Sequence, residues 1–179
     1  MNRDLINKIP KRKILIGIIA FILIALPAAI LPSRLVIAFG HSVNYNLFWK
    51  KTDDKNLNSL TYDDYVVIET PKENKFTQGV NIIKKVGCKE GDTLIVSVKD
   101  YFCRYAGKND TNYLGKAKDK SKEGIPVQNF NPCSNGNFCV YTIPKGYFFA
   151  IGEHPDSYDS RYLGVINVEK IIAVASPII

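Results

Sequence analysis

One uncharged apolar segment near the amino terminus constrains this chain more than any other feature. Between Ile14 and Ser33 there is no charged residue, and most of these positions are Ile, Leu, Ala or Phe. At about 1.5 Å per residue, a helix over this segment would be roughly 30 Å long, which is the thickness of the hydrocarbon layer of a bilayer. Pro27 and Pro32 lie in its second half, where a kink is expected. The sequence therefore predicts a transmembrane anchor over residues 14–33.

The charges around this segment predict its orientation. Residues 1–13 hold five Arg or Lys residues against Asp4 alone, which is +4 of the formal net charge of +7. Because basic residues stay on the inner side of a membrane, we expect a cytoplasmic basic tail and residues 34–179 in the periplasm of a bacterium. Most of the excess charge is then an orientation signal, so the basic composition does not predict a nucleic-acid partner.

A cleaved secretion signal is the alternative to a retained anchor. Ala38-Phe39-Gly40 offers small residues before a cut at His41. The apolar segment is, however, longer than the 7–15 residues typical of a signal-peptide core. The retained anchor is the prediction, and an amino terminus starting at His41 would contradict it.

Four cysteines lie after the anchor, and the oxidising compartment expected there favours disulfide bonds. The sequence has no Cys-x-x-Cys and only two histidines, so a zinc site is poorly supported, and we expect neither a metal nor a cofactor. Four cysteines allow three pairings. We favour Cys88 with Cys103, which flank a predicted strand, and Cys133 with Cys139, which would close a small loop.

The remainder of the chain predicts a mainly β domain with short strands and long loops. Residues 50–64 and 107–124 are polar and predict loops, and the lysines of the second loop favour a solvated surface over a phosphate-binding patch. No helical periodicity follows the anchor. Short β-branched or aromatic runs predict strands at residues 65–68, 80–86, 93–98, 140–143, 147–151 and 171–174. The turn at residues 88–92 predicts a hairpin or another tight connection between the second and third of these strands.

An outer domain tethered to a membrane, without a metal cluster or a cofactor loop, is typical of a hydrolase or a binding protein. A hydrolase needs a nucleophile and a base. His41 adjoins Ser42, but neighbours on an extended chain point to opposite faces. His154 lies on a polar turn, and nothing beside it marks a nucleophile.

Lys84 is the better candidate for a base. On an extended strand it shares one face with Ile82 and Val86, while Lys85 points to the other face. Burial on an apolar face lowers the pKa of a lysine from its ordinary value of about 10.4, because desolvation penalises the ammonium form. The alternative, in which both lysines extend to solvent from an edge strand, stays open on spacing alone.

A polar turn after the aromatic run 147–151 is the second candidate site. Ser157, Asp159 and Arg161 follow one another at alternate positions, so a charge-assisted pair can form beside a hydroxyl. The turn is either a structural clasp or the wall of a site. Ser160 is expected to form a hydrogen bond within the turn.

Four segments, in order along residues 36–175, resemble those of the type I signal peptidases. They are the serine segment Gly40–Trp49, the segment Tyr62–Ile68, the pair Lys84-Lys85 followed by Gly91-Asp92, and the segment Ser157–Gly164 with its Ser-x-Asp-Ser-Arg-Tyr-x-Gly core. The short last segment is most similar to the TraF-type conjugal peptidases. The chain departs from the family pattern at three places, where Asn44 replaces a proline, Asp63 replaces a glycine and Gly40 replaces a hydroxyl residue.

The resemblance implies a signal-peptidase-like antiparallel β domain and a Ser–Lys serine endopeptidase. Ser42 would be the nucleophile, Lys84 its base, and Ser157 a hydroxyl that orients the amine by a hydrogen bond. Asp159 and Arg161 would support the turn as an ion pair. The Ser42 backbone N–H would donate to the oxyanion, and Gly40 leaves the second donor unassigned.

The substrates implied are exported precursors cleaved after small residues, and the TraF likeness points to pilin maturation beside a conjugative secretion apparatus at the inner membrane. Two alternatives remain. One is a catalytically inactive relative that serves as a subunit of such an apparatus, and the other is a disulfide-bonded periplasmic binding module unrelated to proteases.

Overall fold

The computed structural model describes residues 11–52, 60–133 and 136–179, which divide into the units Met1–Leu35 and Val36–Ile179. Most of the predicted cytoplasmic tail therefore lies outside the described residues. In the first unit helix α1, Lys11–Arg34, covers the predicted anchor. Among the described residues, we find no helix whose length and hydropathy would let it cross a membrane. The structure thus confirms a helix over residues 14–33 and does not confirm its transmembrane role.

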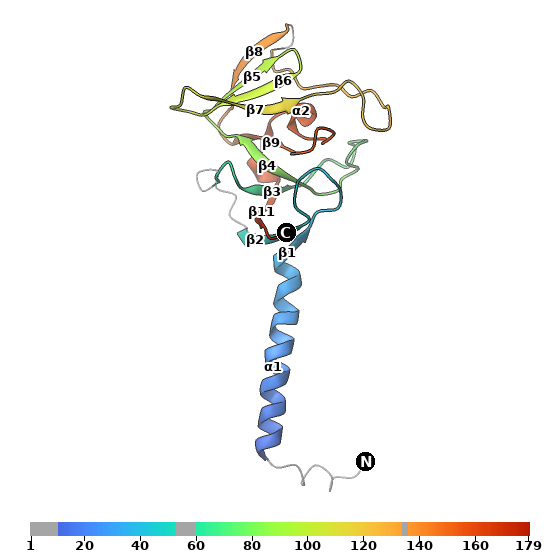
Figure 1. The fold of residues 1–179 in the computed structure, drawn as a ribbon, viewed down its shortest axis with the longest axis vertical. Coiled ribbons are helices and arrows are strands. Elements are labelled where there is room, and N and C mark those ends of the chain that lie inside the picture. Colours follow the sequence, from blue (N-terminus) through green and yellow to red (C-terminus); the bar gives the residue numbers. More distant parts are fainter. Residues whose placement is uncertain (1–10, 53–59, 134–135) are drawn as a thin grey trace. The chain divides into compact units, whose positions relative to one another are not determined.

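The second unit is mainly β, as predicted, and its described strands form two antiparallel sheets (Figure 1). The larger sheet has the order β1-β2-β11-β3-β4-β9-β10, and the smaller has the order β7-β6-β5-β8. Two predicted strands have the observed bounds, and four others agree within a few residues. The strands are β1 Leu35–Ile37, β2 Leu47–Thr52, β3 Tyr65–Ile68, β4 Ile82–Cys88, β5 Thr93–Ser97, β6 Asp100–Arg104, β7 Thr111–Lys116, β8 Phe138–Thr142, β9 Tyr147–Ile151, β10 Ile166–Asn167 and β11 Ile171–Pro177.

Of the two alternatives predicted for the turn after β4, the structure excludes the hairpin, because β4 and β5 lie in different sheets. Strand β4 pairs with β3 on one edge and with β9 on the other, so no edge is left for β5. Gly87 permits the close approach to β9, since a Cβ there would lie 3.2 Å from Ile151 Cγ2 and from the Phe149 carbonyl oxygen. The turn is a tight connection between sheets.

Three other expectations also need correction. Residues 107–124 are not one solvated loop, because Thr111–Lys116 form β7 by pairing with β6. The predicted loop 50–64 begins inside β2, which pairs with β11. A four-residue helix α2, Ser160–Leu163, and a 3₁₀ turn η2, Val168–Lys170, follow β9 and β10, so helical structure does occur after the anchor.

Both predicted disulfides are confirmed, Cys88–Cys103 and Cys133–Cys139. The first joins the end of β4 to β6, and so ties the large sheet to the small one. Around it lies an apolar core in which Phe149 of β9 packs with Leu94 and Tyr101 of the small sheet. The disulfide therefore fixes the end of the strand that carries Lys84.

Candidate active site

Strand β4 sets the surroundings of Lys84. Val66 of β3 lies opposite Lys84 in the sheet register, and Lys84 shares its face with Ile82 and Val86, as the two-residue period predicts. Val66 and Val86 belong to the apolar core of this face, against which Ile82 packs. Only 3% of Lys84 is exposed. The predicted apolar face is therefore the observed one.

The pKa of Lys84 is lowered to about 8, mainly by burial. The negative charge of Asp159 acts in the opposite direction, and the positive charge of Arg161 acts in the same direction as burial. A lysine with this pKa is partly neutral near neutral pH and can accept a proton. The next residue on the strand, Lys85, lies on the other face and forms an ion pair with Asp63 at 3.3 Å.

Ser42 lies in the segment between β1 and β2 and is fixed by the turn that follows β9. Its carbonyl oxygen accepts hydrogen bonds from the backbone N–H of Glu153 at 2.8 Å and of His154 at 3.4 Å. The Glu153 carboxylate in turn accepts from the Asn44 N–H at 2.8 Å and from the Tyr65 hydroxyl at 3.0 Å. Four hydrogen bonds thus hold the backbone around a half-buried serine.

Ser42 and Lys84 line one cavity of about 460 Å³, which we call the Lys84 cavity. Its other walls are mostly apolar, with Phe76, Val80 and Ile82 among them. The sequence places these two polar residues 42 positions apart, and the fold brings them to one space. A hydroxyl and a partly neutral amine in one apolar space are what a Ser–Lys hydrolase requires.

Ser42 also lines a second cavity of about 330 Å³, which we call the basic cavity. Ser42, Phe76 and Tyr158 line both cavities. The remaining walls of the basic cavity bring together both histidines, Ser157 and a group of charged side chains. They are His41, Lys118, Lys120, Ser121, Lys122, Glu123, Val127, His154, Asp156, Ser157 and Tyr162.

The buried hydroxyl of Ser157 has no hydrogen-bond partner among the described residues, so the predicted bond to the Lys84 amine is not formed. Ser157 is nevertheless packed tightly into the site. A Cβ on Gly152 would collide with the Ser157 Oγ and would lie 2.7 Å from the Ser42 carbonyl oxygen. Only glycine therefore fits at position 152, where the Ser42 and Ser157 segments meet.

Asp159 and Arg161 form the predicted ion pair, and both side chains are almost completely buried. The pair is bidentate, with 2.6 Å from Arg161 Nη2 to Asp159 Oδ2 and 2.9 Å from Nε to Oδ1. The same carboxylate accepts from the Gly152 N–H at 2.7 Å, and Arg161 Nη1 donates to the Lys116 carbonyl at 3.1 Å. The pair is thus a clasp between β9, α2 and the end of β7. The Ser160 hydroxyl accepts from the Ala150 N–H at 2.9 Å. This bond joins the turn to β9, so the expected hydrogen bond within the turn is wrong.

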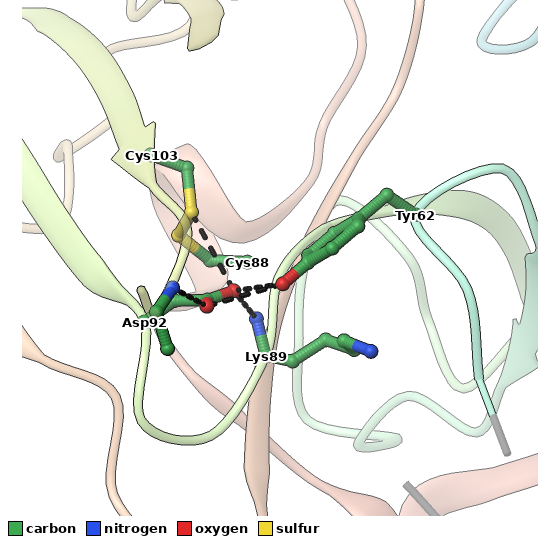
Figure 2. The surroundings of a disulfide bond; sticks show 6 residues. Tyr62, Cys88, Lys89, Asp92 and Cys103 are labelled. Carbon is green, nitrogen blue, oxygen red and sulfur yellow. Dashed lines mark hydrogen bonds between the residues drawn. A yellow bond between two sulfur atoms is a disulfide. The ribbon is translucent and has the colours of Figure 1, made fainter. Parts of the chain in front are cut away.

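Asp92 is a second buried carboxylate, next to the Cys88–Cys103 disulfide (Figure 2). It accepts from the Tyr62 hydroxyl at 2.9 Å, from the Lys89 N–H at 2.7 Å and from the Ala106 N–H at 2.8 Å. Burial, followed by the bond to Asp92, raises the pKa of Tyr62, so this phenol stays a donor. Asp92 and the two cysteines place three ligand-type atoms together, but both sulfur atoms are in the disulfide and are not available as thiolates.

Two parts of the site were missed by sequence reasoning. Residues 117–127 were expected to be mostly solvated loop, and they line the basic cavity. Thr77 lines the Lys84 cavity with a buried hydroxyl that has no partner among the described residues. Nothing in the spacing of these residues indicated either position, because both depend on contacts with distant turns.

Comparisons with family models and with solved structures both found matches. A family model described as signal peptidase, peptidase S26, matches residues 12–179. The crystal structure of a signal peptidase I from Enterococcus faecalis V583 is 19% identical with a TM-score of 0.40, and the match covers 66% of this chain and 97% of that chain. No match was found among curated proteins.

Proposed function

This chain belongs to the peptidase S26 family of signal peptidases, whose model spans residues 12–179, and from that premise we propose a Ser–Lys mechanism at Ser42 and Lys84. Membership implies a serine endopeptidase that cleaves signal peptides from exported precursors. It also excludes the binding module unrelated to proteases. The observation that carries the proposal is a buried lysine, with a pKa lowered to about 8, lining one cavity with a half-buried serine.

In the proposed reaction the neutral Lys84 amine takes the hydroxyl proton of Ser42 as its Oγ attacks the scissile carbonyl carbon. The Ser42 backbone N–H donates to the oxyanion that forms. The ammonium then returns the proton to the leaving amine, the carbon–nitrogen bond breaks, and an acyl-enzyme remains. Water attacks the ester with Lys84 again as base, which releases the carboxylic acid and restores the serine.

In this proposal Asp159, Arg161 and Ser157 position the reacting groups and do not react themselves. Asp159 and Arg161 hold the turn that supports Ser42, through Gly152 and its neighbours. The Ser157 hydroxyl, which has no hydrogen-bond partner among the described residues, is proposed to orient the Lys84 amine.

Ser42→Ala and Lys84→Ala test the mechanism on a precursor peptide. Each should abolish detectable cleavage, and the double variant should be no worse than either single variant, because the two groups act as a unit. Ser97→Ala, on the small sheet, is the matched control and should cleave normally. Wild-type rates in both site variants would contradict the mechanism. A wild-type protein that neither cleaves nor reacts with a penem inhibitor would favour the alternative, an inactive subunit of a secretion apparatus.

We further propose that the enzyme is of the TraF type and matures a pilin precursor for conjugative transfer. The support is the short segment Ser157–Tyr162, which is most similar to that of the TraF-type peptidases. Cleavage of a pilin precursor in preference to a general secretory precursor, under matched conditions, is the expected result. Equal cleavage of both would count against this specialisation.

The membrane location is also a proposal, and it rests on the sequence. The uncharged segment 14–33 follows a basic tail, and the large apolar side chains described in α1 are exposed, from Ile14 at 43% to Ile24 at 72%. Two disulfides fit a periplasmic domain. The protein should remain in the inner-membrane fraction after a carbonate wash, and protease added outside spheroplasts should digest residues 34–179. Release by carbonate would contradict the anchor.

A further inference from the structure

The basic cavity carries charges that the proposed cleavage reaction does not use. Three lysines line it, Lys118, Lys120 and Lys122, against the carboxylates of Glu123 and Asp156. Lys118 is neutralised by an ion pair with Asp156. Among the described residues, neither Lys120 nor Lys122 forms an ion pair, although the charge of Lys122 acts on Glu123 and Asp156. Three lysines against two carboxylates leave the cavity beside Ser42 with a net charge of +1.

The segment that carries these lysines, residues 117–127, is an ordered turn. The Ser121 N–H donates to the Ile125 carbonyl and the Val127 N–H to the Asp119 carbonyl, both at 2.8 Å. Lys120 forms an antiparallel bridge with Pro126. Because the backbone is closed on itself in this way, the two lysines are presented from a defined position.

Residues 117–127 are also fixed to the candidate active site. The Lys118 N–H donates to the Tyr162 hydroxyl at 2.8 Å, and the Tyr162 ring stacks on Tyr158 at 5.3 Å between centroids. Tyr158 in turn contacts Phe76 at 4.7 Å. An aromatic row therefore runs from the basic turn to the wall that both cavities share with Ser42.

The two cavities differ in the chemistry that they favour. Apolar side chains in the walls of the Lys84 cavity favour the small residues before the cleaved bond, whereas the basic cavity shares Ser42, Phe76 and Tyr158 with it and has charged walls. We propose that the basic cavity binds an acidic side chain of the precursor, on the mature side of the cleaved bond, through Lys120 and Lys122. This inference rests on the proposed function and names a class of substrate for it.

The test uses the full-length protein and paired precursor peptides that carry Glu or Gln at each of the first four mature positions. Exposed ion pairs are weak, so two lysines should favour one Glu peptide by roughly twofold to thirtyfold in kcat/KM at low salt. The double variant Lys120→Gln/Lys122→Gln should lose this preference and keep the wild-type rate on the Gln peptide. The preference should also shrink at high salt, because surface charges are screened.

Two controls make the result specific. Lys108→Gln/Lys145→Gln removes two exposed lysines outside the cavity and should keep the Glu preference. Lys120→Glu/Lys122→Glu should instead favour a peptide with Lys at the same position. A Glu preference that survives in the Lys120→Gln/Lys122→Gln variant would overturn the assignment, as would equal rates on all wild-type pairs.

A binding measurement separates this inference from the mechanism. The Ser42→Ala variant should bind the Glu peptide more tightly than the Gln peptide, whether or not the wild type cleaves either one. Cleavage of both peptides without any charge preference would refute the acidic subsite alone. Charge-dependent binding without cleavage would support the subsite and refute the Ser–Lys mechanism.

Discussion

Lys84 and Lys85 are neighbours on one strand and have opposite surroundings. Lys84 lies against an apolar core, and the carboxylate whose charge it senses, Asp159, is already paired with Arg161. The Lys85 side chain is 29% exposed and pairs with Asp63, which is exposed. The comparison teaches that the face of β4, set by its pairing with β3, decides whether a lysine is a candidate base or an ordinary surface cation.

Arginine substitution gives the largest expected difference between the two positions. Lys84→Arg should reduce kcat/KM by about a thousandfold, because a guanidinium keeps its proton and cannot act as a base. Lys85→Arg should change kcat/KM by less than about twofold, since an exposed ion pair contributes little. Peptide cleavage by the two variants measures the contrast directly. Near-equal losses of kcat/KM in the two variants would show that the face of β4 does not decide which lysine acts as the base.

Substitution of the carboxylate near each lysine should also have a large effect at the buried site and a small effect at the exposed site, here on stability. Asp159→Asn leaves the buried Arg161 without its partner and should lower the free energy of unfolding by about 3–5 kcal/mol. Asp63→Asn, beside Lys85, should leave the thermal midpoint unchanged. Thermal and denaturant unfolding test both. A mild effect of Asp159→Asn would mean that water or another group compensates the Arg161 charge.

The local part of this contrast could be predicted from the sequence. A period of two residues placed Lys84 with Ile82 and Val86, and the spacing of Asp159 and Arg161 predicted their pair. Long-range contacts could not be predicted. Strand β7 exists because β6 pairs with it, although its own residues are mostly polar. Residues 117–127 lie at the site because Lys118 contacts Asp156 and Tyr162, which are about 40 positions away.

Removing the Lys84 charge should stabilise the fold while it abolishes activity. The folded-state pKa, about 8, is lower than the unfolded value of about 10.4, so at pH 7 the buried ammonium costs about 3 kcal/mol. Lys84→Met should raise the free energy of unfolding by up to this amount. Lys85→Met should not.

The free energy of unfolding of the wild type should depend on pH with a definite sign. Between about pH 8 and 10.4 the unfolded chain holds more protons at position 84 than the folded chain, so the stability of the wild type should rise with pH. The difference between Lys84→Met and the wild type should therefore shrink across this range, and kcat/KM of the wild type should rise with a midpoint near pH 8. A midpoint near 6.5 would indicate a histidine as the base.

The smallest expected effect concerns two threonines at the ends of the segment 70–77, which leads to the Lys84 cavity. The buried hydroxyl of Thr70 donates to the Val80 carbonyl at 2.7 Å, while the buried Thr77 hydroxyl has no partner among the described residues. Because an unpaired buried hydroxyl is unfavourable, Thr77→Val should raise the free energy of unfolding by about 1 kcal/mol. Thr70→Val should lower it by a similar amount, since it leaves a carbonyl unpaired.

The catalytic rate then reveals what the Thr77 hydroxyl does. If Thr77→Val is more stable and cleaves at the wild-type rate, the hydroxyl is only a packing defect beside the apolar face of β4. A more stable variant with a lower kcat and an unchanged KM would mean that Thr77 supplies the oxyanion donor that Gly40 cannot provide. Equal destabilisation by both valines would instead show that the Thr77 hydroxyl has a hydrogen-bond partner in solution. The predicted difference between the two threonines would then be wrong.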